Sequence, residues 1–170
     1  MIRQATPSDL EAILTIYNDA IVNTTAVYSY HAQTLEDRKV WFVQKQTDGY
    51  PVIVYEVEGN VAGFATFGPF RAWPAYKYSI EHSVYVSSDF RKRGIGRALL
   101  QELIRLARAD EYKTLVAGID ATNEQSILLH KNLGFTHSGT IRNAGYKFER
   151  WLDLAFYQLD LEGPKNPEEG

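Results

Sequence analysis

Residues 84–97 read Val84-Tyr85-Val86-Ser87-Ser88-Asp89-Phe90-Arg91-Lys92-Arg93-Gly94-Ile95-Gly96-Arg97. An apolar strand pattern passes here through a short basic turn into a helical pattern that begins near Ile95. The two glycines allow a ligand to approach the backbone closely, and the N–H groups at a helix start have no partner inside the helix. The stretch therefore predicts an anion site with several donors. The alternative is an ordinary glycine-containing turn with solvated charges.

The glycine spacing excludes two other phosphate-binding loops. A Walker loop needs Gly-x-x-x-x-Gly-Lys-Ser/Thr, which is absent, and a dinucleotide fingerprint needs a third glycine where Leu99 stands. The net charge of -3 also lacks the basic field of a nucleic-acid-binding protein. Any anion site is therefore local, and we expect no nucleic-acid partner.

The pattern of the remaining chain predicts the element order β-α-α-β-β-β-α-β-α-β-β. Helices are expected after the N-cap sequences at Thr6 and Thr34, over 95–109, and after Asn123. Strands are expected near Ile2 and over 52–57, 61–67, 79–86, 114–119, 135–140 and 147–159. This order predicts a mixed α/β (α+β) fold, with a sheet that has helices on its faces.

Length and composition are those of one folded domain. The chain has 170 residues, of which 45% are hydrophobic and 23% charged. We expect a single domain over 1–161 and a disordered tail over 162–170, where Gly, Pro and acids replace apolar residues. No apolar run reaches 18 residues and no signal-peptide core follows Met1, so we expect a cytoplasmic protein without a membrane partner.

The absence of cysteine and the spacing of the histidines exclude some kinds of catalytic and metal site. The chain has no cysteine, which rules out a cysteine nucleophile and a thiolate zinc site. The four histidines show no metal-ligand spacing, so we expect no metal.

The motif Arg91-x-x-Gly94-x-Gly96 after Ser83-Val84-Tyr85-Val86 resembles the pyrophosphate-binding motif of the GNAT N-acetyltransferase superfamily, Gln/Arg-x-x-Gly-x-Gly/Ala. Other segments resemble its phosphinothricin and methionine sulfoximine acetyltransferase branch: Ile16-Tyr17-Asn18-Asp19-Ala20, Asn23-Thr24-Thr25-Ala26, Ile80-Glu81-His82-Ser83-Val84-Tyr85-Val86 and Trp151-Leu152-Asp153. The resemblance covers about residues 2–160. It implies a mostly antiparallel mixed sheet flanked by helices on both faces, and a homodimer.

The same resemblance implies acetyl-CoA as cosubstrate. The pantetheine arm is expected on the backbone of Val84, Tyr85 and Val86. The pyrophosphate is expected on a turn that contains Arg91, Lys92, Arg93, Gly94, Ile95, Gly96 and Arg97. Asn123 matches a coenzyme-contacting asparagine of the family, although helix capping alone also explains it.

Two residues are candidates for proton transfer. Glu81 lies on a predicted strand among apolar and aromatic neighbours, where burial raises a carboxyl pKa and suits a general base. An exposed glutamate or a salt-bridge partner is the alternative. His130 matches a histidine of the branch proposed to assist proton transfer, and a packing or surface histidine is its alternative. Phe135 excludes the tyrosine acid that many superfamily members place there.

The acceptor implied by the resemblance is a small amino-acid analogue such as methionine sulfoximine, methionine sulfone or phosphinothricin. Its expected contacts are Arg71, Ala72, Trp73, Glu81, His82 and Ser83. Strand alternation places Glu81 and His82 on opposite faces, so simultaneous contact by both side chains is not expected. The loop 68–73 is less regular than is typical of the branch, which leaves the choice of acceptor open.

We therefore expect an acetyl-CoA-dependent N-acetyltransferase that transfers acetyl directly to an α-amino group. Two alternatives stay open: an acetyltransferase for another amine or a peptide N-terminus, and a noncatalytic acyl-CoA-binding sensor.

Overall fold

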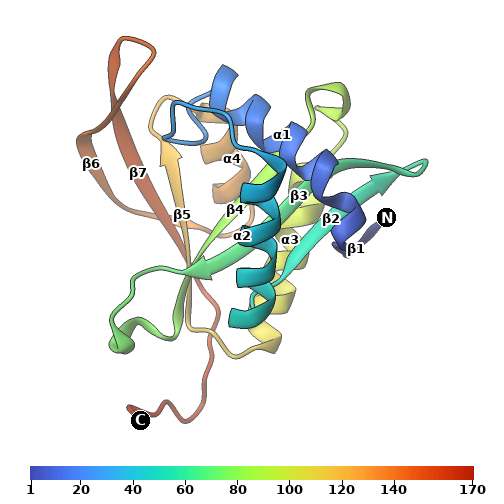
Figure 1. Cartoon of the computed structure of the whole chain (residues 1–170). Helices are drawn as coiled ribbons and strands as arrows, with labels where there is room; N and C mark the ends of the chain where they lie inside the picture. The colour runs from blue at the N-terminus through green and yellow to red at the C-terminus, as the bar shows by residue number, and fades with distance from the viewer. The chain divides into compact units, whose positions relative to one another are not determined.

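The helices and strands of the computed structural model, which describes residues 1–170, follow the predicted order. The helices are α1 (Leu10–Asn23), α2 (Leu35–Asp48), α3 (Ile95–Ala109) and α4 (Glu124–Asn132). The strands are β1 (Ile2–Gln4), β2 (Val52–Val57), β3 (Asn60–Pro69), β4 (Ser79–Val86), β5 (Thr114–Asp120), β6 (Thr136–Lys147) and β7 (Arg150–Asp160) (Figure 1).

Strand pairing is antiparallel in β1–β2, β2–β3, β5–β7 and β6–β7, and parallel in β4–β5. The prediction of a mixed, mostly antiparallel α/β fold is thus confirmed.

The chain forms two compact units. The first contains Met1–Phe67 and Ser83–Leu100, and the second contains Gly68–His82 and Gln101–Gly170. Strands β1, β2 and β3 neighbour one another in that order in the first unit. In the second unit the order is β4, β5, β7 and β6. Strand β4 starts in the second unit and ends in the first.

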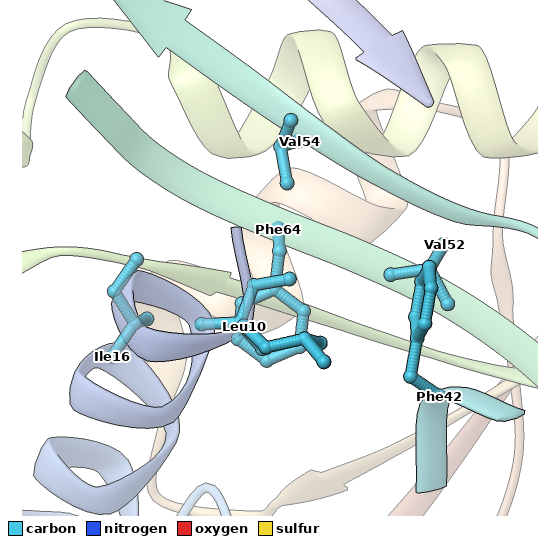
Figure 2. Packing of buried hydrophobic residues seen from close by; sticks show 7 residues of the cluster. Leu10, Ile16, Phe42, Val52, Val54 and Phe64 are labelled. Atoms are coloured by element: carbon cyan, nitrogen blue, oxygen red, sulfur yellow. The ribbon is translucent and has the colours of Figure 1, made fainter. Parts of the chain in front are cut away.

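One face of β2 and β3 in the first unit carries the apolar core of α1 and α2. Figure 2 shows Leu10 of α1 against Phe64 of β3, and Phe42 of α2 beside Val52 of β2. Helix α1 places Leu10, Ile13 and Ile16 on one stripe, which is the spacing of a helix packed along one side. At 0–6% exposure, these side chains supply the burial that stabilises the unit.

Helix α2 begins where the sequence predicted it, whereas α1 begins at Leu10, after a 3-10 turn over Pro7–Asp9 that follows the predicted cap Thr6. Thr34 accepts a hydrogen bond from the Asp37 N–H, and the Asp37 carboxylate accepts one from the Thr34 N–H, which completes a capping box for α2. Helix α2 ends at Gly49, which adopts the left-handed conformation with φ of 77°.

The other face of β3 is covered by the start of α3. A Cβ atom at Gly63 would lie 2.9 Å from the carbonyl oxygen of Tyr85 and 3.1 Å from Cδ1 of Leu99. Because Gly63 and Phe64 are consecutive strand residues, they point to opposite faces. The first unit therefore has helices on both faces of its strands, as the resemblance implied.

The predicted limits of the last two strands are wrong. Strand β6 continues through residues 141–146, between the two predicted strands, and ends at Lys147, where the last strand was expected to begin. The register shifts between His137 and Gly139 and again between Ile141 and Gly145, which removes the alternation of side chains that identifies a strand. The turn that follows uses Phe148 and Glu149 at φ of 52° and 61°, without the Asn-Gly signature of such turns.

Gly63→Ala tests the close packing of β3. Since the added methyl group would meet a backbone oxygen that cannot rotate away, we expect the free energy of unfolding to fall by about 1–3 kcal/mol. Urea unfolding followed by circular dichroism measures this change. An unchanged midpoint would contradict the close approach of Gly63 to Tyr85.

Candidate active site

The basic turn before α3 has the geometry of an anion site. Lys92 and Gly94 adopt positive φ, at 63° and 76°, between residues of ordinary conformation. Such alternation directs successive N–H groups to one side of the backbone, and the N-terminus of α3 adds the N–H groups of its first turn. Positive φ is free of strain at Gly94 but costs energy at Lys92, which is typical of a functional turn.

The charged side chains of this turn are exposed. They are Arg91, Lys92, Arg93 and Arg97. The Arg91 guanidinium lies 3.6 Å from the Asp19 carboxylate of α1, and the Arg93 guanidinium lies 5.2 Å from the centre of the Phe90 ring. Local positive charge therefore surrounds the turn in a chain whose net charge is negative.

Strand β4 leads into this turn with Ser83, Val84, Tyr85 and Val86, all half-buried. The Tyr85 ring packs against Phe64 and Tyr17, with ring centres 5.1 and 5.5 Å apart. These contacts fix the inner side of the segment that the sequence assigned to the pantetheine arm.

In the second unit, Glu81 is a half-buried carboxylate. It faces Val116 of β5 in the parallel ladder, and its Oε2 lies 3.1 Å from the position that a Cβ at Gly118 would occupy. Burial raises the pKa of Glu81, and the positive charge of Arg71 opposes that shift in part. The carboxylate is thus a better proton acceptor than a solvated glutamate.

The loop 68–73, which the sequence predicts to contact the acceptor, carries exposed residues. Arg71, Ala72 and Trp73 all lie at the surface of the second unit, and 74% of the Trp73 side chain is exposed. The Arg71 guanidinium lies 5.3 Å from the centre of the Phe70 ring, and Phe70 contacts the ring of Phe156 on β7. Arg71 can therefore bind an anionic group from solvent.

His82 has different neighbours from Glu81, as strand alternation predicts. It is 7% exposed, and its Nε2 lies 3.0 Å from Nε2 of His130 on α4. The two rings are stacked with an angle of 18° between them, and Phe135 contacts both edge-on. His82 is therefore a core residue of the second unit.

Hydrogen bonds determine which nitrogens of this histidine pair carry protons. Nδ1 of His130 lies 2.7 Å from the Ser126 carbonyl oxygen, which can only accept, so this nitrogen donates. In neutral His130, Nε2 then accepts a hydrogen bond from Nε2–H of His82. His82 Nδ1 is left without a hydrogen-bond partner.

Both histidines are neutral at physiological pH. Burial lowers the pKa of both histidines, and the neighbouring His130 ring further lowers that of His82, to about 3. Because both nitrogens of His130 are engaged, any proton it transfers to a ligand must pass along the bond to His82 or follow the breaking of that bond.

Asn123 has the capping role that the sequence allowed. Its side-chain oxygen accepts a hydrogen bond from the Ser126 N–H at 3.1 Å, which caps α4.

The contact between His82 and His130 was not predicted from the sequence. The two residues are 48 positions apart, and no local pattern indicates a pairing at that separation.

Comparisons with known proteins identify the family. The family model for an acetyltransferase (GNAT) domain matches residues 2–156. The chain belongs to the GNAT acetyltransferase family.

Three GNAT relatives are similar over nearly their whole length. A methionine sulfoximine/methionine sulfone acetyltransferase from Pseudomonas aeruginosa is 45% identical, over 95% of this chain and 94% of the relative. The crystal structure of a phosphinothricin acetyltransferase from Sinorhizobium meliloti, in complex with acetyl-CoA, is 36% identical with a TM-score of 0.95, covering 100% of this chain and 94% of that one. A ribosomal-protein-alanine N-acetyltransferase from Brucella melitensis is 49% identical with a TM-score of 0.93, covering 94% and 99%.

The protein is therefore a GNAT N-acetyltransferase, and acetyl-CoA is the cosubstrate of this enzyme class. No three His, Asp or Glu side chains come together as a metal-binding group. None of the four helices combines the length and the apolar character needed to cross a lipid bilayer.

Gly118→Ala tests whether the space beside Glu81 matters. Its methyl group would lie 3.1 Å from Oε2 of Glu81 and 3.3 Å from Leu154, so the carboxylate must move. We expect acetyl transfer to fall at least about tenfold, because a small displacement of the predicted base is costly. Steady-state kinetics and the melting temperature measure this. Full activity in the folded variant would show that the position of Glu81 is not critical.

The histidine pair predicts a specific pH dependence of stability. Because the folded-state pKa of His82 is lowered, its contribution is fully present above the unfolded pKa near 6.5 and is lost as pH falls toward 3. We expect it to remove up to about 1.4 kcal/mol per pH unit from the free energy of unfolding. Urea unfolding between pH 4 and 7 should show a shallower slope for His82→Gln. Equal slopes would contradict the burial of neutral His82.

Proposed function

We propose that this enzyme transfers the acetyl group directly from acetyl-CoA to the α-amino group of small amino-acid analogues: methionine sulfoximine, methionine sulfone and phosphinothricin. The half-buried Glu81 carboxylate beside Gly118 carries the proposal, because its raised pKa suits a general base. The names of the Pseudomonas and Sinorhizobium relatives support this acceptor class.

In the proposed reaction, Glu81 takes a proton from the acceptor ammonium group, directly or through water. The free amine nitrogen then attacks the thioester carbonyl carbon, so that a C–N bond forms and the C–S bond breaks. The attacking nitrogen loses its second proton as the amide forms, and the departing thiolate of coenzyme A takes up one proton. We propose that the neutral His130 relays this proton rather than supplying one. We also propose that no acetyl-enzyme forms, in keeping with the absence of a cysteine nucleophile.

The coenzyme is proposed to bind along β4 and its turn. The backbone of Val84–Val86 holds the pantetheine arm, and N–H groups between Lys92 and Arg97 bind the pyrophosphate, with positive charge from the four basic side chains. We propose that Asn123 also contacts the coenzyme. Glu81 and Val84 lie on one strand, three residues apart, which sets their separation at about 10 Å.

The acceptor is proposed to bind with its anionic groups on Arg71. A guanidinium can hold a carboxylate or phosphinate through two parallel hydrogen bonds. Ala72, Trp73 and Ser83 complete the proposed acceptor contacts, and a contact from His82 was also expected from the sequence. Since His82 is buried, we propose that it positions the backbone of β4 and does not contact the ligand.

We further propose a cytoplasmic homodimer that detoxifies these amino-acid analogues, with 1–161 as its catalytic domain and 162–170 as a tail. The exposed aromatic side chains of Trp73 and Tyr76, and Trp151 on β7, support a protein interface because large exposed apolar groups favour association.

Glu81→Gln tests the assignment of the base. With methionine sulfoximine as acceptor, we expect release of coenzyme A thiol to slow by on the order of 10² or more. Since the folded-state pKa of Glu81 is raised, its ionised form costs stability at pH 7, and Gln should keep or raise the melting temperature. The matched control is Glu58→Gln, in the exposed β2–β3 turn. A fully active Glu81→Gln enzyme would overturn the assignment.

A second candidate function is acetylation of a peptide N-terminus, which the name of the Brucella relative favours. Thiol release should be compared for methionine sulfoximine, methionine sulfone, phosphinothricin and an alanine-starting peptide. The proposal predicts turnover on the small analogues. Turnover on the peptide alone would establish the second function, and tight acetyl-CoA binding without any turnover would establish a sensor.

A further inference from the structure

Arg38 is a buried charge that the proposed chemistry does not use. It lies on α2 with 4% of its surface exposed. Its guanidinium carbon is 4.1 Å from the centre of the Tyr17 ring and 4.4 Å from the centre of the Trp41 ring. The cation is thus stacked between an aromatic side chain of α1 and one of its own helix.

No carboxylate forms a salt bridge with this charge. The adjacent Asp37 and the Tyr17 side chain favour the charge electrostatically, but the Nε of Arg38 has no hydrogen-bond partner. The adjacent Asp37 is occupied in the α2 capping box. Burial lowers the pKa of Arg38, but a guanidinium stays protonated. Removing this charge from water therefore destabilises the folded protein. A leucine or methionine would fill this space without that cost, which points to a functional reason for arginine.

The rings that hold Arg38 continue to the coenzyme-binding strand. Tyr17 contacts Tyr85 of β4 edge-on, with an interplanar angle of 85°. Trp41 contacts Phe64 edge-on, and Phe64 in turn contacts Tyr85. Two chains of ring contacts therefore start at the faces of the Arg38 guanidinium and meet at Tyr85.

We propose that Arg38 is a positioning residue for acetyl-CoA: it fixes Tyr17 and Trp41, and through them the Tyr85 backbone that receives the pantetheine arm. A planar cation between two rings has one favoured orientation, whereas an aliphatic chain would let both rings tilt. Any tilt of Tyr17 displaces its edge contact with Tyr85. The inference rests on the proposed function only in assigning Val84–Val86 to the coenzyme.

Direct binding of coenzyme A to the full chain tests this inference without any acceptor. Calorimetric titration should show that Arg38→Met weakens coenzyme A binding by about tenfold or more. We expect Arg38→Lys to bind with intermediate affinity, because it keeps the charge but not the planar stack. Lys39→Met, on the exposed side of α2, is the matched control and should bind like wild type.

Kinetics separate positioning from a merely structural role. With acetyl-CoA and methionine sulfoximine varied in turn, Arg38→Met should raise KM for acetyl-CoA and leave KM for the acceptor within about twofold. A folded Arg38→Met protein with wild-type coenzyme affinity would overturn the proposal. If Arg38→Met fails to fold, Tyr17→Leu decides: unchanged coenzyme affinity in that variant contradicts the proposed chain of contacts, and weakened affinity supports it.

Failure of this inference differs from failure of the proposed function. If wild type does not bind coenzyme A, the assignment of Val84–Val86 is wrong and both proposals fall. If wild type binds but acetylates none of the small analogues, only the acceptor assignment falls, and the Arg38 comparison still stands.

Discussion

The Glu81 carboxylate lies over Gly118, and this close approach between β4 and β5 constrains the residues around it. A charged group can be half-buried on a strand only if the adjacent strand leaves room and a cation is near enough to limit the cost. Gly118 leaves the room, and Arg71 supplies the positive charge. The balance keeps the carboxyl pKa above its usual value while still allowing ionisation, which is the condition for a general base.

Within five residues, side chains of strand β4 lie in three different environments. Glu81 faces Gly118, His82 joins His130 in the core of the second unit, and Tyr85 belongs to the aromatic cluster of the first unit. Alternation of side chains makes this possible, because neighbouring residues point to opposite faces. The strand that leads into the basic turn is thus anchored by buried polar and aromatic contacts rather than by apolar packing alone.

Local signals in the sequence predicted the elements around the site well. Thr34 and Asn123 cap helices as their residue types suggested, and the glycine-containing turn precedes α3 as its spacing indicated. The burial of Glu81 also followed from its apolar neighbours. By contrast, register shifts in β6 removed the alternation on which strand prediction depends, so the strand was predicted too short.

Long-range contacts could not be predicted from the sequence. The pairing of His82 with His130 has no signature in either segment, and Arg38 reads as one more charged residue of an amphipathic helix until its two stacking rings are seen. In both cases a buried polar group depends on a partner from a distant part of the chain, which is His130 for His82 and Tyr17 for Arg38. Such compensation depends on tertiary structure, which pattern analysis does not capture.

The most direct test of the account is the pH dependence of kcat/KM for methionine sulfoximine, in wild type and in Glu81→Gln. If Glu81 is the base, wild type has an acid-side inflection above the ordinary glutamate pKa of 4.5, and this inflection disappears in the variant. An identical inflection in both enzymes would contradict the account, because the proton would then be accepted by another group.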